Sequence, residues 1–289
     1  MVNRRRPDAL HRRLEHAVAR VGGELTACRL CRGIEFAELR DFARLPRVSS
    51  DCRPWPAGGR LVVCRACGMP QSAIDSEGRA ELAAIYRDYS LNAPWGGREV
   101  AVRADPRGAM ERRSAGLMRR LATEVRLPAR GQALDIGCGT GAMLAAFGEH
   151  RGGWRLHGHD LDTRNARLLA ALPGFAMLHT GAISAVPGRF DLVTLSHSLE
   201  HMLDPRAVLA DIVGRLAPRG RLFVQVPDWH ANPWDLVVAD HVAHFDAVTL
   251  PELMASAGFA CRIVAAWAPR ELSALAVKAG RADPPALDP

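Results

Sequence analysis

The chain has 289 residues, of which 48% are hydrophobic and 24% are charged, as in an ordinary globular protein. Its 38 Lys and Arg residues outnumber 31 Asp and Glu residues, and nearly all of the positive charge is arginine because Lys278 is the only lysine. This skew is weak evidence for a nucleic-acid partner. No uncharged run approaches the roughly 18 residues of a membrane span, and no apolar segment follows the arginines at 4–6. We therefore expect neither a membrane span nor a secretory leader, and a cytoplasmic protein.

Residues 1–22 form the first predicted element, a basic amphipathic helix. Apolar side chains recur there at helical spacing, at Leu10, Leu14, Val18 and Val21. Glycines at 22–23 then supply a stop. A helix with a solvated arginine face is the favoured interpretation, and a phosphate-binding arm is the alternative.

Four cysteines dominate residues 23–90. They form two C-x2-C pairs, Cys28 with Cys31 and Cys64 with Cys67. Two residues between cysteines let both thiolates of a pair bind one ion, and two pairs complete a tetrahedron, so we predict a zinc-binding module with a closed, structural Zn²⁺ site. A redox pair or buried thiols are the alternatives. The other cysteines lack partners at this spacing, and the odd total of 7 argues against a set of disulfides.

A linker or lid is predicted over residues 91–114, where Pro, Gly and Asp interrupt the chain. The arginine-rich segment 112–126 carries an apolar stripe made of Leu117, Met118, Leu121 and Val125. Such a stripe is typical of a helix that packs on a sheet.

The most informative stretch is an apolar strand at 133–136 that runs into a glycine turn. Gly137, Gly139 and Gly141 remove three side chains where the backbone must turn tightly and approach a ligand. A strong helix former begins at Ala142. A strand, a glycine turn and a helix are typical of a nucleotide-type site at a helix N-terminus. A loop without a ligand is the alternative on spacing alone, because the pattern differs from the dinucleotide fingerprint.

Strands and helices alternate after this turn. Residues 154–160 indicate a second strand that ends in Asp160, where a carboxylate can accept both hydroxyls of a ribose. Further strands are predicted at 175–178, 190–195 and 222–224, with helices at 205–216 and 249–257 and a turn at 218–220. This alternation predicts an α/β domain over residues 115–280, followed by a frayed tail at 281–289.

The segment LDIGCGTG, Asp160 and the later strands resemble the class I S-adenosylmethionine-dependent methyltransferases, whose first motif and ribose acid they match. The resemblance covers roughly residues 115–280. It implies a Rossmann-like methyltransferase sheet with S-adenosylmethionine as the cofactor. The residues that it places at the cofactor are Asp135, Gly137, Cys138, Gly139, Gly141, Asp160, Leu161, Ser196 and His197.

A narrower resemblance joins the two halves of the chain. The four-cysteine module, whose second pair is followed by Gly68, and the aromatic stretch at 85–90 look like the N-terminal part of the bacterial sugar C-methyltransferases. In that family this region helps to hold a nucleotide-linked sugar. The family also carries a C-terminal domain, for which we expect no counterpart within these 289 residues. We therefore carry over the general reaction and substrate class, but not C-methylation as such.

Histidine is suited to accept a proton near neutral pH, and two histidine-bearing segments follow predicted strands. The first holds Glu200 and His201 in a Leu-Glu-His turn. It resembles the turn that lines the cofactor and substrate side in many small-molecule methyltransferases. A structural helix turn is the alternative.

The second segment holds Asp240, His241 and His244. The sugar C-methyltransferases have a Tyr-His-Glu-His motif here, and the resemblance puts their proposed base on His241 and their Glu on Asp240. Val238 stands at the Tyr position, so one proposed catalytic group is missing. His244 stands where that family has an aromatic residue and is the second candidate base.

We therefore expect an enzyme that moves a methyl group from S-adenosylmethionine to an oxygen or carbon of a small polar acceptor, with a histidine base. Sugars, nucleotide-sugars, glycans and secondary metabolites are the acceptors considered. An RNA methyltransferase that grips RNA with the zinc module and arginines is the first alternative, but only 6% of the residues are aromatic. A non-catalytic, cofactor-binding partner subunit is the second. The sequence does not indicate an oligomeric state.

Overall fold

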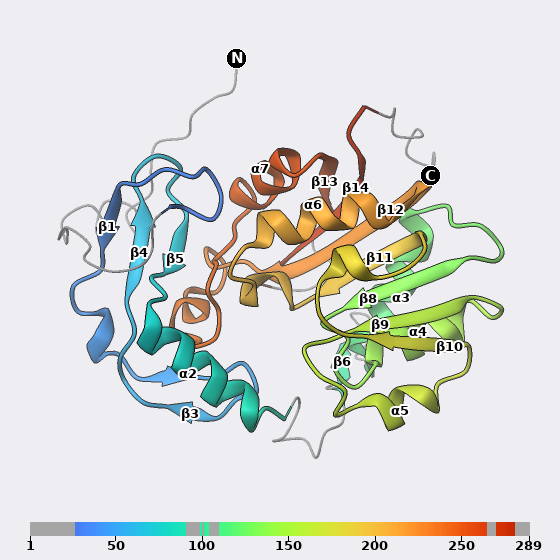
Figure 1. Ribbon diagram of the computed structural model, residues 1–289, viewed down its shortest axis with the longest axis horizontal. Helices are drawn as coiled ribbons and strands as arrows, with labels where there is room; N and C mark the ends of the chain where they lie inside the picture. The colour runs from blue at the N-terminus through green and yellow to red at the C-terminus, as the bar shows by residue number, and fades with distance from the viewer. Residues whose placement is uncertain (1–26, 91–98, 100, 104–109, 265–269, 281–289) are drawn as a thin grey trace.

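The computed structural model describes residues 27–90, 99, 101–103, 110–264 and 270–280 (Figure 1). The predicted basic helix at 1–22, the tail at 281–289 and much of the predicted linker at 91–114 lie outside these residues. Within the described part, no helix is both long enough and apolar enough to cross a membrane.

A 7-stranded sheet forms the larger part of the structure, in the strand order β10-β9-β8-β11-β12-β14-β13. Its strands are β8 (Gln132–Ile136), β9 (Arg155–His159), β10 (Phe175–His179), β11 (Phe190–Ser196), β12 (Leu216–Pro227), β13 (Phe259–Val264) and β14 (Glu271–Lys278). The first five strands pair in parallel, and β14 lies antiparallel between β12 and β13. The predicted Rossmann-like sheet is confirmed.

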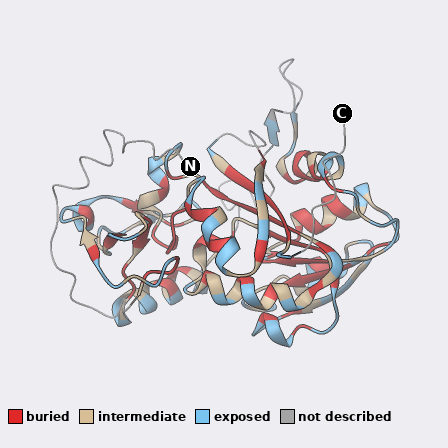
Figure 2. Cartoon of the chain, turned by 90° about the horizontal axis from the view of Figure 1, so that it is seen from above, coloured by how far each residue is buried: buried red, intermediate tan, exposed pale blue. Residues whose placement is uncertain are grey.

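Helices cover both faces of this sheet. Neighbouring residues of a strand point to opposite faces, so each strand packs against helices on both sides. Leu192 and Phe223 belong to the buried cluster that includes helices α3 (Arg113–Glu124) and α4 (Ala142–His150). Val193 and Val224 belong to the cluster that includes α6 (Pro205–Arg215) and α7 (Thr249–Ser256). The short helix α5 (Ala166–Ala170) precedes β10. Figure 2 shows the buried residues running through the strands between these helices.

A small antiparallel module precedes the sheet domain. Its 3-stranded sheet has the order β1-β4-β5. The elements of this part are β1 (Phe36–Glu38), η1 (Phe42–Arg44), β2 (Arg47–Val48), β3 (Pro54–Trp55), β4 (Leu61–Cys64), β5 (Pro70–Ser72) and α2 (Ser76–Arg87), followed by β6 (Ala101–Arg103) and β7 (Met110–Arg112). Cys28, Val62 and Met69 belong to the same buried cluster as the α6 face of the large sheet, so the module packs directly on the sheet domain (Figure 1).

The boundary between α6 and β12 corrects one prediction. The sequence predicts a helix through Leu216 and a turn at 218–220, but α6 ends at Arg215 and β12 begins at Leu216. Leu216 pairs with Phe190, and the register then shifts before the next pair. Gly220 permits this, since a Cβ atom there would lie 2.7 Å from the carbonyl oxygen of Phe190. Strand pairing therefore overrides the local turn signal.

Candidate active site

The glycine turn after β8 requires glycine at both of its ends. Gly137 and Gly141 have φ angles of 74° and 84°, in the left-handed region. A Cβ atom on Gly137 would lie 2.5 Å from the Cβ atom of Ser198, and one on Gly141 would lie 2.5 Å from Leu169 Cδ2. The backbone can therefore follow this tight path to the N-terminus of α4, which opens toward a cavity of about 360 Å³ beside Thr140 and Gly141.

Asp160, immediately after β9, ties the second strand to this turn. Its Oδ2 accepts a hydrogen bond from the Gly139 amide at 2.7 Å, and its Oδ1 accepts one from the Leu161 amide at 2.7 Å. The Leu161 side chain itself is 73% exposed. A carboxylate has further lone pairs beyond these two bonds, so Asp160 can still accept ribose hydroxyls.

Two other residues predicted at the cofactor lie inside the sheet domain. Asp135 is buried and accepts a 2.6 Å hydrogen bond from Thr194 Oγ1, between neighbouring strands. Burial raises the pKa of Asp135 to about 7, although the bond from Thr194 acts in the opposite direction. Cys138 is also buried, with its Sγ 3.9 Å from Asp160 Oδ2. Asp135 therefore joins β8 to β11 just before the glycine turn, and Cys138 lies in the turn beside Asp160.

His197 follows β11 and gathers charged groups from distant elements. Its amide donates to the Gln225 carbonyl at 2.8 Å, and its φ angle is 52°. Its ring contacts Arg113 and lies 3.3 Å from Glu271 Oε1. Burial and Arg113 lower the pKa of His197, but Glu200 and Glu271 outweigh them and the net shift is upward. Sequence reasoning missed Arg113, Gln225 and Glu271, none of which belongs to a local motif.

Glu200 is a fully buried carboxylate among His197, His201 and His241, which together with Glu200 we call the histidine cluster. Neither of its oxygens has a hydrogen-bond partner among the described residues, and its closest charged contact is His197 Nδ1 at 3.4 Å. Burial raises the pKa of Glu200, but His197, His201 and His241 lower it further and keep it below its usual value. The carboxylate is therefore ionised and balanced by histidine charge.

Asp235 contacts both histidines of the segment 240–244, which we call the histidine segment. The sequence analysis did not select Asp235. Asp235 lies in η5 (Pro233–Val237), and its two oxygens lie 2.6 Å from His241 Nδ1 and 2.7 Å from His244 Nδ1. Burial opposes protonation of His241, but Asp235 and the nearby carboxylates raise its pKa to about 9. His241 is therefore a cation near neutral pH.

The carboxylate of Asp240 bonds to Ser50, whereas the ring of its neighbour His241 bonds to Asp235. The Asp240 carboxylate accepts hydrogen bonds from the amide and hydroxyl of Ser50, at 2.8 and 2.6 Å. Ser50 belongs to the small module, so Asp240 joins the module to the histidine segment. The hydroxyl oxygen of Tyr89, another module residue, lies 3.1 Å from the hydroxyl oxygen of Ser50.

His201 has the environment of a neutral imidazole. Its Nδ1 lies 3.0 Å from the backbone oxygen of Asp240 and 3.0 Å from the hydroxyl of Tyr86. A carbonyl oxygen only accepts, so Nδ1 carries the hydrogen and Nε2 keeps a lone pair. Burial and the charge of His241 lower the pKa of His201, against Glu200 and Asp240. Its side chain is 17% exposed, more than those of His241 and His244.

Two groups of side chains bring possible metal-ligating atoms within 4.8 Å of one another. The first is made of Cys28, Cys31, Cys64 and Cys67, with Sγ pairs 3.6 and 3.5 Å apart, and this all-sulfur donor set fits a structural Zn²⁺ ion. The second is made of Glu200, His201 and His241. We assign no ion to this second group.

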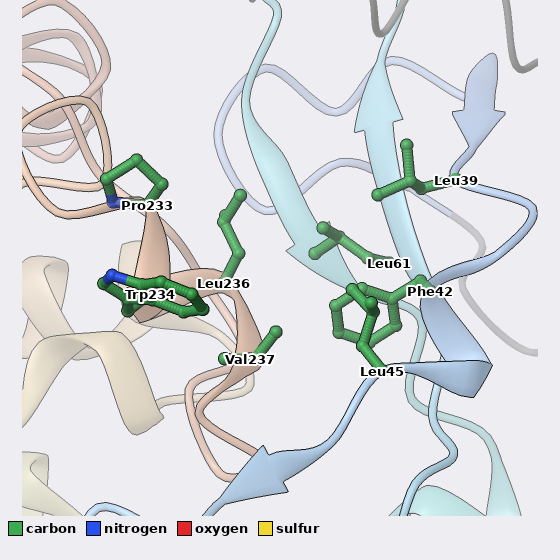
Figure 3. Close-up of a pocket in the computed structure, with 8 residues that line it drawn as sticks. All are labelled: Leu39, Phe42, Leu45, Leu61, Pro233, Trp234, Leu236 and Val237. Carbon is green, nitrogen blue, oxygen red and sulfur yellow. The ribbon is translucent and has the colours of Figure 1, made fainter.

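An apolar pocket of about 200 Å³ lies between η5 and the small module (Figure 3). It is lined by Leu39, Phe42, Leu45, Leu61, Pro233, Trp234, Leu236 and Val237. No titratable side chain lines it, so it cannot supply the acid–base chemistry of the histidine cluster.

Residues 107–263 match the profile of a family described as a methyltransferase domain. The chain is 30% identical over 119 residues to a ubiquinone biosynthesis O-methyltransferase of Idiomarina loihiensis, which covers 38% of this chain and 48% of that protein. It is 34% identical over 99 residues to the enzyme of that name from Neisseria meningitidis serogroup C, which covers 31% and 41%. The chain thus spans about half the length, or less, of these curated relatives. The structure of the mitomycin 7-O-methyltransferase MmcR superposes with a TM-score of 0.51 at 18% identity, over 58% of this chain and 53% of that one.

Proposed function

The chain belongs to the methyltransferase domain family, which residues 107–263 match, and from this premise we propose that it methylates an oxygen or carbon atom of a small polar acceptor. The donor is S-adenosylmethionine. The observation that carries the proposal is the junction of Asp160 with the glycine turn, through the 2.7 Å bond from the Gly139 amide. It joins the ribose acid to the loop that approaches the rest of the cofactor.

In this proposal the glycine turn, Asp160, Ser196 and His197 hold the cofactor at the ends of β8, β9 and β11. When bound, S-adenosylmethionine supplies a methyl group that is already activated as part of a sulfonium. The protein therefore has two tasks, which are to align the acceptor and to remove its proton. His197 also connects the cofactor side to Arg113 and Glu271, through the contacts described above.

We assign the proton acceptor to Nε2 of His201. The proton that the acceptor atom loses on methylation would pass to this nitrogen. The sequence favours His241 as the base, but Asp235, 2.6 Å from its Nδ1, and the nearby carboxylates raise its pKa to about 9, so both ring nitrogens carry a proton near neutral pH. A base must be unprotonated at working pH, and a lowered pKa suits His201 to this role.

The charged and titratable groups that face His201 come from three parts of the chain. They are Tyr86 on α2, Glu200 beside His201 in the sequence, and Asp240 and His241 on the histidine segment. The rings of His201 and His241 meet edge to face, with centroids 4.7 Å apart. His241 and the buried surroundings together keep His201 neutral.

The small module forms the acceptor side of this site in our proposal. Tyr86 and Ser50 reach the histidine cluster from the module, and a polar acceptor between the two parts would meet hydroxyls as well as imidazoles. The resemblance to sugar methyltransferases supports a sugar, nucleotide-sugar, glycan or secondary metabolite. The names of the relatives, which are O-methyltransferases of small molecules, support oxygen as the methylated atom.

We further propose that Zn²⁺ occupies the four-cysteine cluster and has a structural role. A closed site with four thiolates leaves no open position for catalysis. The buried Arg29, which follows Cys28 in the sequence, would offset part of the negative charge of the thiolates.

Transfer of label from methyl-labelled S-adenosylmethionine into a fractionated cell extract tests the function. The purified protein is incubated with small-molecule and ribosomal-RNA fractions, and the products are examined by mass spectrometry. We expect label in the small-molecule fraction, and none with an Asp160→Ala variant. Label in ribosomal RNA would establish the RNA alternative instead. A failure of both fractions to accept label would favour a non-catalytic, cofactor-binding subunit.

A further inference from the structure

We propose that Gln71 is a positioning residue, which links the four-cysteine cluster to the histidine segment and so makes methyl transfer depend on an intact cluster. This inference rests on the proposed function, because the histidine segment is the part of the site assigned to the acceptor. It adds a task for the small module that neither the family match nor the relatives assign.

The side chain of Gln71 is attached entirely to the cysteine cluster. Gln71 is fully buried. Its Nε2 donates to Cys28 Sγ at 3.2 Å, and its Oε1 accepts from the Arg29 amide at 3.1 Å and from Arg29 Nη1 at 3.2 Å. Every one of these contacts depends on where the first cysteine pair lies.

The backbone of Gln71 is attached to the histidine segment. Gln71 forms an antiparallel bridge with Ala243, between the two histidines of the segment. The His244 amide donates to the Pro70 carbonyl at 3.1 Å, and the Ser72 amide donates to the Val242 carbonyl at 3.1 Å. The β5 strand therefore extends across the boundary between module and domain.

A side-chain hydrogen bond also joins β5 to the histidine segment. Ser72 Oγ donates to the carbonyl oxygen of His241 at 3.0 Å. On the other side, the Val242 and Ala243 amides both donate to the carbonyl oxygen of Glu200, at 2.8 and 3.1 Å. The segment is thus held between β5 and the turn that carries Glu200 and His201.

The consequence concerns the relative position of two rings. The backbone of His241 is bonded to β5, the backbone of His201 belongs to the turn after β11, and His201 Nδ1 lies 3.0 Å from the Asp240 carbonyl oxygen at the junction of the two. A shift of β5 would move the His241 charge relative to His201 without touching the glycine turn or Asp160. Disorder at the cysteine cluster should therefore reduce methyl transfer while cofactor binding is retained.

Gln71→Met tests the link, because it keeps the volume of the side chain and removes its hydrogen bonds. Gln132→Met, at the start of β8, is the matched control. We expect Gln71→Met to retain one equivalent of zinc and a Kd for S-adenosylmethionine within about twofold of the wild type. Its kcat should fall on the order of 10- to 100-fold, as expected for a misplaced catalytic group. The control should keep its kcat.

NMR titration of the histidine rings supplies a readout that needs no acceptor. In Gln71→Met, the pKa of His201 should rise toward its ordinary value, because the His241 charge no longer lies against it in the same way. Removal of zinc from the wild-type protein with a thiol reagent should produce the same change. Unchanged titration curves would overturn the inference, as would equal losses of cofactor binding and turnover. If the wild type transfers no methyl group but the curves move as expected, the proposed function fails and the link stands.

Discussion

Asp235→Asn is the substitution that bears most directly on the charge balance of the histidine cluster. The side chain is nearly isosteric and the site is buried, so the change removes charge without opening a cavity. Asp235 and the nearby carboxylates raise the pKa of His241 from 6.5 to about 9 against the effect of burial. At about 1.36 kcal/mol for each unit, this shift corresponds to an upper limit of about 3 kcal/mol of folding free energy.

The sign of the effect follows from the direction of the shift. A group whose pKa is higher in the folded state stabilises the fold fully below its unfolded pKa, and this contribution is lost as the pH rises through the folded pKa. For His241 the window therefore runs from about pH 6.5 to about pH 9. The wild type should lose stability across this window, and Asp235→Asn should already have lost most of that contribution at pH 6.

Urea unfolding followed by tryptophan fluorescence between pH 6 and pH 9.5 measures the difference. Asp162→Asn is the control, because that carboxylate is partly exposed and pairs with Arg164. We expect the control to parallel the wild type, and we expect Asp235→Asn to converge with both near pH 9.5. Parallel curves for Asp235→Asn and the wild type would refute the claim that this carboxylate holds a proton on His241.

Three further predictions follow from the geometry of the site. Gly137→Ala should lower the free energy of unfolding by about 1–3 kcal/mol, because the new Cβ atom clashes with Ser198 and the backbone is left-handed. Gly152→Ala, which has open space around it, should leave the thermal melting point unchanged. Equal melting points for the two variants would show that the turn is not this tightly packed. Elemental analysis should find one equivalent of zinc in the wild type and in Cys52→Ser, and none in Cys64→Ser. Fewer than half an equivalent in freshly purified wild type would overturn the four-thiolate site. His201→Gln should lower kcat by about 100-fold or more while the Kd for S-adenosylmethionine is kept, and a normal kcat would place the base elsewhere.

The strand–turn–helix unit at the cofactor site could be predicted because its signals are local. An apolar run before Gly137 and a strong helix former after Gly141 lie within one short stretch, and the structure places β8 and α4 there. Asp160 follows the same logic, because the end of a parallel strand lies at the ligand edge of the sheet. The strands at 175–178 and 190–195 were predicted for the same reason and correspond to β10 and β11, whereas β12 begins at Leu216, well before the predicted residue 222.

The acid–base partners could not be predicted because they depend on long-range packing. The ring of His241 bonds to Asp235 rather than to its neighbour Asp240, and Asp235 lies in η5, a helix of 5 residues that is too short to show hydrophobic periodicity. Tyr86 reaches His201 across 115 positions of sequence. The position of η5 and of the residues after it is fixed by contacts such as the hydrogen bond from the Ala239 amide to the carbonyl oxygen of Val48 in the small module. Such contacts leave no mark in a local pattern.

Calorimetric titration of S-adenosylmethionine into the purified protein, with Asp160→Ala and His201→Gln in parallel, tests the central claim most directly. The account predicts one binding site per chain in the wild type, loss of binding in Asp160→Ala and retention of binding in His201→Gln. Absence of binding in the zinc-loaded wild type, or undiminished binding in Asp160→Ala, would contradict it.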